Sequence, residues 1–221
     1  FRCGRLLPLP TVTAVVVLPT EPLVFTLSAI VLIVTGIISA TRAVMGFAEA
    51  GAAIDDMTKR TGASAESLSQ LKYAAEQSGT SIDDVEKGMR KLSDVTTEAA
   101  RGGTAAQKAL GRVGLTAADL EDLSPDQRFL AVSEALSRVT DPAERASLAM
   151  DLLGKSGANL LPLMEEGASG IQTMMAEADQ LGLTLSGDQA AAAAGFDDAW
   201  AKLTSTLGGA AARAVGAVDL G

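Results

Sequence analysis

The pattern with the clearest chemical meaning is the octapeptide AMDLLGKS at residues 149–156. It matches a relaxed phosphate-binding loop in which alanine stands at the first glycine. Such a loop needs a preceding strand and a following helix, so that backbone N–H groups surround the phosphates. Residues 144–153 instead have helical apolar spacing, which makes Gly154 a helix C-cap and places Lys155 near the negative end of the helix dipole. We interpret the peptide as a structural turn, and a nucleotide-binding enzyme remains an alternative.

Adjacent acidic residues are the second candidate for chemistry, as a general acid and base. Neighbours on a helix point to different faces, so these pairs do not converge on one site. The absence of histidine removes the commonest general base and metal ligand, and the single cysteine, Cys3, excludes an internal disulfide. We therefore expect no enzyme, no catalytic residues, no metal and no cofactor. The acidic pairs are Asp55–Asp56, Asp83–Asp84, Glu165–Glu166 and Asp197–Asp198.

The net charge and the aromatic content of the chain limit which partners and which kind of fold we expect. The formal net charge of the 221-residue chain is −9, which argues against a specific nucleic-acid surface because that needs a basic patch. Aromatic residues make up 3% of the chain, although 48% of it is hydrophobic. An alanine-rich, aromatic-poor and acidic chain is typical of long helices with thin packing. We expect no small-molecule substrate.

An uncharged apolar run from Pro22 to Thr41 precedes the charged part of the chain. As a helix it would span about 30 Å at about 1.5 Å per residue, the thickness of a bilayer core. We predict a membrane-spanning helix, and a buried core helix in a soluble assembly is the alternative because the run contains serine, threonine and glycine. Its membrane-facing residues are Leu23, Val24, Phe25, Leu27, Ile30, Val31, Leu32, Ile33, Val34, Ile37 and Ile38.

Helix start and stop signals punctuate the chain after Arg42. A capping residue followed three positions later by an acceptor predicts a helix start, and a glycine after an apolar-periodic stretch predicts a helix end. The predicted starts are Ser81 with Asp84, Thr104 with Gln107, Thr116 with Asp119, Ser124-Pro125 with Gln127, and Asp141-Pro142 with Glu144. The predicted ends are Gly62, Gly79, Gly114, Gly154 and Gly182.

Apolar residues between these signals recur at helical spacing, and no stretch after residue 44 alternates like a strand. We predict an all-α fold without a sheet: one long apolar N-terminal helix, then short-to-medium amphipathic helices joined by Gly, Ser and Pro turns. The expected divisions are an irregular segment 1–21, an apolar helix 22–50, a multi-helix region 51–185 and an alanine-rich C-terminal helix 186–221. The expected helix-packing residues are Ile82, Val85, Met89, Leu92, Phe129, Val132, Leu136, Val139, Ile171, Met174, Leu181, Phe196, Trp200 and Leu203.

Five runs occur in an order and spacing that resemble the tail tape measure protein of long-tailed bacteriophages and prophages. The resemblance covers about residues 44–207, and an apolar segment upstream of it is also common in that family. The runs are FAEAGAAIDDMTKRTG at 47–62, SAESLSQLKYAAEQSG at 64–79, LSPDQ at 123–127, DPAERA at 141–146 and LGKSGANLLP at 153–162.

The resemblance implies a structural protein of the virion tail lumen that sets tail length and assists genome delivery across the host membrane. It implies tail tube subunits and tail assembly chaperones as partners, self-association into a helical bundle, and no catalytic residues. Family members are longer, so we expect this chain to be a fragment. The alternative function is a helical interaction module anchored in the bacterial inner membrane.

Overall fold

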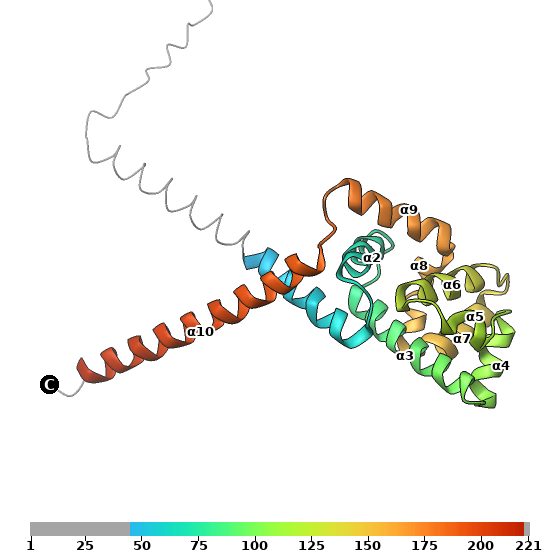
Figure 1. The fold of residues 1–221 in the computed structure, drawn as a ribbon, viewed down its shortest axis with the longest axis horizontal. Helices are drawn as coiled ribbons and strands as arrows, with labels where there is room; N and C mark the ends of the chain where they lie inside the picture. Colours follow the sequence, from blue (N-terminus) through green and yellow to red (C-terminus); the bar gives the residue numbers. More distant parts are fainter. Residues whose placement is uncertain (1–44, 219–221) are drawn as a thin grey trace, which may run out of the picture. The chain divides into compact units, whose positions relative to one another are not determined.

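The computed structural model describes residues 45–218, without the side chains of residues 197, 203 and 207–218. All regular structure in this range is helical and none of it is a strand, which confirms the predicted all-α class there (Figure 1). The predicted membrane segment, Pro22 to Thr41, lies outside the described residues. Among the helices that are described, none has both the length and the apolarity needed to span a bilayer.

The chain divides into two compact units, Phe1–Val44 and Met45–Gly221, and the structure describes the second. A helix over residues 45–61 opens this unit and runs across the boundary expected at residue 50. The elements that follow are α2 Ala65–Gln77, α3 Ile82–Ala100, α4 Thr104–Arg112, α5 Ala117–Glu121, α6 Pro125–Ser137, α7 Pro142–Leu153, the 3-10 helix η1 Gly154–Ala158, α8 Leu161–Glu165, α9 Gly167–Gln180 and α10 Gly187–Val218.

Helix α3 is the central element of the body. It packs against α2, α4, α5, α6, α7 and η1, because buried residues occupy a wide face along its length. Gly88 on this face leaves room for Leu160, since a Cβ at Gly88 would lie 2.9 Å from the Leu160 Cδ1 atom. Helix α9 lies across α2 and α6, and closes the other side of the body.

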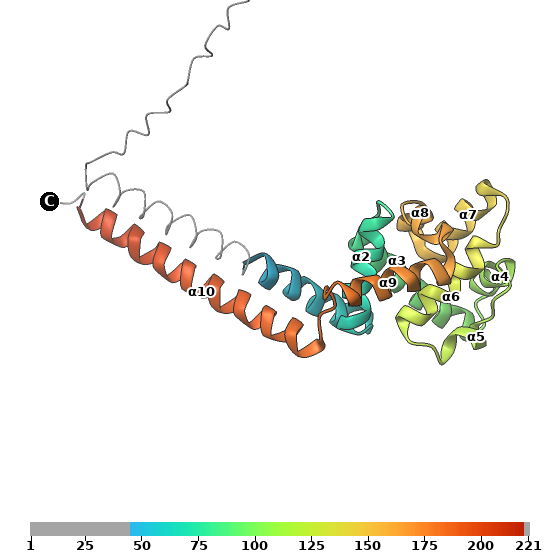
Figure 2. The same ribbon diagram turned by 90° about the horizontal axis from the view of Figure 1, so that it is seen from above.

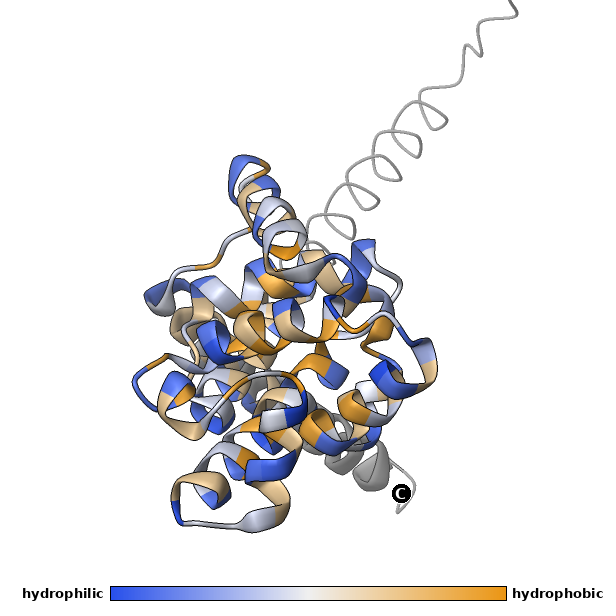
Figure 3. Cartoon of the chain, turned by 90° about the vertical axis from the view of Figure 1, so that its right-hand side faces the viewer, coloured by the Kyte–Doolittle hydropathy of each residue, from blue (hydrophilic) through white to orange (hydrophobic). Residues whose placement is uncertain are grey.

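The described body has one hydrophobic core, to which most of its helices contribute buried residues. Phe129, Leu68, Leu92, Leu136 and Leu148 are almost completely buried within it. Figure 3 shows hydrophilic stretches mainly at the outer turns of the body and hydrophobic ones toward its middle. The expectation of thinly packed helices is therefore wrong for this region, because leucines supply the volume that aromatic residues do not.

Helix α10 differs from the other helices in how little of it is buried. Near its start, Ala190 and Ala193 are buried, and a Cβ at Gly51 would collide with the Cβ of Ala193. The small residues thus let α10 and the helix over 45–61 lie side by side at this point (Figure 2). Beyond Ala193, exposed or half-buried residues occupy the described positions of α10.

The predicted helix starts are confirmed at four of five places. Ser81 and Asp141 accept hydrogen bonds from the backbone N–H groups of Asp84 and Ala143, at 3.1 Å each. Thr116 and Asp119 form a complete capping box, and the backbone N–H of Ser124 donates to Gln127 Oε1 at 3.2 Å.

The predicted capping role of Thr104 with Gln107 is wrong, although α4 begins at Thr104. The chain turns at Gly102, whose φ of +92° lies in the left-handed region, so Gly103 becomes the N-cap and Thr104 the first helical residue. The amide of Gln107 donates to the carbonyl of Ala99 at 3.0 Å instead of reaching back to its own helix start. The five predicted helix ends, Gly62, Gly79, Gly114, Gly154 and Gly182, all have positive φ.

Candidate functional site

The peptide at 149–156 has the geometry of a helix end. Helix α7 runs into it, Gly154 adopts a φ of +71°, and η1 follows directly. The Ser156 hydroxyl is buried and donates to the Leu153 carbonyl at 3.0 Å, and the Ser156 carbonyl accepts from the N–H groups of Asn159 and Leu160. The tripeptide is thus the start of a 3-10 helix that follows an α-helix, whereas a phosphate-binding loop connects a strand to a helix.

Gly157 explains why the turn is so tight. A Cβ at this position would fall onto the carbonyl of Ala149 in α7. The glycine thus allows η1 to lie directly against the last turns of the helix that precedes it.

In three of the four acidic pairs, one member makes a contact within the local structure. Asp55 pairs with Lys59 at 2.6 Å, which raises the pKa of Lys59 through that hydrogen bond and the charge of Asp55. Asp84 accepts from the Ser81 hydroxyl at 3.0 Å and from the Asn159 amide at 3.2 Å. Glu165 pairs with Arg145 at 3.3 Å.

Most of the residues expected to pack lie in or against the core. Leu181 is an exception, because it caps the end of α9 and is 58% exposed. Phe196 is also exposed, at 42%, and stacks on Trp200 with ring centroids 6.3 Å apart, since α10 has left the body by this point. The side chain of Leu203 is not among those described. The buried members are Val85, Met89, Leu92, Phe129, Val132, Leu136 and Ile171, and the partly buried ones are Ile82, Val139 and Met174.

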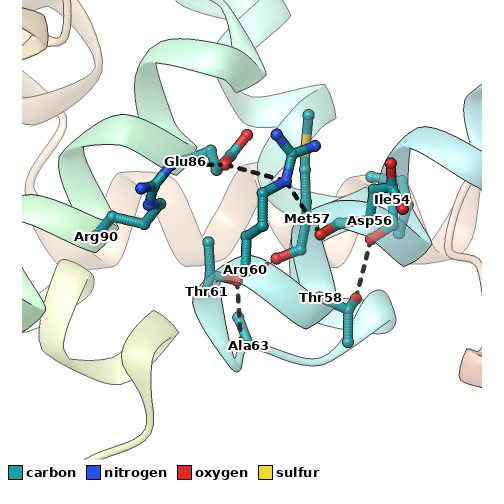
Figure 4. Close-up of polar contacts among 9 residues, drawn as sticks. All are labelled: Ile54, Asp56, Met57, Thr58, Arg60, Thr61, Ala63, Glu86 and Arg90. Carbon is teal, nitrogen blue, oxygen red and sulfur yellow. Dashed lines mark hydrogen bonds and ion pairs between the residues drawn. The ribbon is translucent and has the colours of Figure 1, made fainter.

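A cluster of charged residues on α3 is the feature that sequence reasoning missed. Glu86 is a buried acid, with 7% of its side chain exposed, and it lies between Arg60 and Arg90 (Figure 4). Its Oε1 atom is 3.5 Å from Arg60 Nε and 3.7 Å from Arg90 Nη1. Arg60 Nε also donates to the Asp56 carbonyl at 3.3 Å, which holds the guanidinium over α3.

A surface groove of about 410 Å³ opens beside this cluster. Four basic side chains line it: Arg60 from the helix over 45–61, and Lys87, Arg90 and Lys91 from α3. Thr61, Ser93 and Asp94 complete the lining. The spacing of Lys87, Arg90 and Lys91 predicts one helical face, but no local pattern shows that Arg60 joins them from another helix.

A second polar arrangement fastens the connection between α9 and α10 to α2. The Ser69 hydroxyl accepts from the N–H of Leu185 at 3.0 Å, and Glu66 Oε1 accepts from the N–H of Gly187 at 3.0 Å. Hydrogen bonds from its own backbone N–H, from Gly187 and from the Ser64 hydroxyl lower the pKa of the Glu66 carboxyl. The same connection borders an apolar recess of about 250 Å³, whose lining includes Phe47, Tyr73 and Leu183.

Comparison of the chain with known protein families, with curated proteins and with solved structures finds no match.

Proposed function

We propose that the chain is a structural protein of a phage tail, and that it forms part of a tape measure. In this role it extends in the tail lumen, sets tail length with the rest of the tape measure, and assists genome delivery across the host membrane. Its partners are tail tube subunits, tail assembly chaperones and other copies of itself, and it performs no catalysis.

The observation that carries this proposal is the structural use of the residues on which the resemblance rests. Within the five runs, Ser64 and Asp141 cap helices, Gly62 and Gly79 end them, and Ser124 opens α6. The run LGKSGANLLP forms the tight turn that joins α7 to α8. The matched residues thus form helix junctions, which agrees with the structural role that we propose.

The charged residues of these runs support the same role. Asp55 and Lys59 pair with each other along one helix, and Arg145 pairs with Glu165 between helices. Each of these contacts fixes a helix or joins two helices. Such contacts give Asp55, Lys59 and Arg145 structural roles.

The proposal is tested by the location of the chain in assembled particles. Tails are purified from particles of the source phage or induced prophage, and their proteins are identified by mass spectrometry. We expect peptides from α2 to α9 in the same fraction as the tail tube subunit. Recovery of these peptides only from host membranes or cytosol, with tails free of them, would contradict the proposal.

A further inference from the structure

The basic groove, lined by Arg60, Lys87, Arg90 and Lys91, is a locally positive surface on an acidic chain. Its four basic side chains stand against two carboxylates, the buried Glu86 between Arg60 and Arg90 and Asp94 in the lining, although the whole chain carries a formal net charge of −9. Basic side chains therefore outnumber acidic ones at this groove, which is the reverse of the balance of the whole chain. We propose that this groove binds an acidic peptide segment of a partner protein.

The geometry of the two arginines supports a carboxylate ligand. Glu86 already occupies the position between Arg60 and Arg90, but it contacts each with one oxygen at 3.5 Å or more. About half of each side chain, 51% of Arg60 and 56% of Arg90, remains exposed. Because a guanidinium has five N–H donors in a planar fork, both arginines keep donors that face outward for a second carboxylate.

The two lysines extend the basic surface along α3. Lys87 and Lys91 are exposed and one helical turn apart, so their ammonium groups lie on the same side as Arg90. From Lys87 to Asp94 the groove follows about 10 Å of helix axis at about 1.5 Å per residue. That length matches about three residues of an extended peptide at about 3.3–3.6 Å each. Asp94 repels a further acid at its end, so the acidic residues of the ligand face Lys87, Arg90 and Lys91.

The same charges disfavour a nucleic acid. A polyanion that covers more than the groove meets the acidic remainder of the chain, and four cations neutralise few phosphates compared with a dedicated nucleic-acid surface. A short acidic segment places its charge only where the cations are. This inference concerns one surface and holds whether or not the chain acts in a tail.

The test is a binding titration by fluorescence anisotropy with a labelled poly-glutamate peptide and the full chain. In the double variant Lys87→Glu and Lys91→Glu, we expect affinity to fall about tenfold or more, since two attractive contacts become repulsive. The matched control is Lys108→Glu with Lys155→Glu, which changes the net charge equally at exposed positions outside the groove. We expect the control to bind within about twofold of the unaltered chain, and we expect circular dichroism to show the same helix content in all three.

Equal weakening by both double variants would overturn the proposal, because the peptide would then respond only to net charge. Tighter binding of a labelled oligodeoxythymidine than of poly-glutamate would overturn it in favour of a nucleic-acid ligand. Full competition by millimolar inorganic phosphate would overturn it in favour of a small-anion site. Absence of measurable poly-glutamate binding at low salt would also contradict it.

Discussion

At the scale of single residues, the helix junctions depend on a few backbone positions that no other residue type satisfies. Gly157 is the clearest of these, because backbone atoms of Ala149 and Met150 in α7 occupy the space that a side chain would need. Backbone atoms cannot move aside as the end of a flexible side chain can. The close approach of η1 to α7 therefore depends on this glycine.

Gly157→Ala is expected to lower the free energy of unfolding by about 1–3 kcal/mol, the usual cost of overpacking. The control is Gly111→Ala in α4, where a Cβ meets no atom within 4 Å. That change is expected to stabilise by about 0.5–1 kcal/mol, because alanine loses less backbone entropy than glycine in a helix. Urea unfolding followed by circular dichroism measures both, and a Gly157→Ala variant as stable as the original chain would contradict the packing described.

Some of these residue-scale features could be predicted from the sequence and others could not. Capping at Ser81, Thr116 and Asp141 was predictable, because each cap is decided within three residues of chain. The N-cap of α4 was not, because it is Gly103, one residue before the predicted Thr104, and Gly102 turns the chain just before it. The ion pair of Arg60 with Glu86 was not predictable either, because no local sequence pattern indicates which residues of two different helices meet.

At the scale of elements, α10 depends on α2 for its first turn. Glu66 and Ser69 of α2 accept hydrogen bonds from backbone N–H groups of Gly187 and Leu185, and Gln70 is 3.4 Å from the Thr184 hydroxyl. These bonds fix where α10 begins. Since Glu66 is charged in this arrangement, the anchor is expected to depend on pH.

Because hydrogen bonds lower the pKa of folded Glu66, its carboxylate stabilises the fold at pH above its ordinary value of 4.5. This contribution is lost as the pH falls through the lowered pKa of the folded state. We expect the Gly187 amide resonance in ¹⁵N-correlated NMR spectra to shift over that acidic range, and Glu66→Gln to remove the shift. Glu76→Gln, at an exposed position on the same helix, should leave the titration of the Gly187 resonance unchanged. If the Gly187 shift also disappeared in Glu76→Gln, the coupling would not be specific to Glu66.

At the scale of the whole molecule, the described body is a helical domain built around α3. Leu92 on α3 is 1% exposed and belongs to the same core as Phe129 and Leu148. The all-α class followed from helical periodicity after residue 44, whereas the closed core did not. Periodicity shows that a face is apolar, but it does not show whether the face meets its own chain or another copy.

Leu92→Ala is expected to reduce the free energy of unfolding by about 2–5 kcal/mol, because it leaves a cavity beside several helices. Leu183→Ala is the control, since Leu183 is 49% exposed, and it is expected to change stability by less than about 0.5 kcal/mol. Chemical denaturation of both variants measures the difference. Equal small effects would mean that α3 is not at the centre of a closed core.

We propose that this chain helps to set tail length, and the exposed part of α10 allows that role to be tested. Residues 197–218 form the part of α10 beyond its buried start, so their in-frame deletion from the gene should leave the core of the body intact. A helix of that length spans about 33 Å at about 1.5 Å per residue. Electron microscopy of the resulting tails should show mean length reduced by about 33 Å, and duplication of the same residues should lengthen tails by the same amount. Tails of unchanged length in both the deletion and the duplication would contradict the claim.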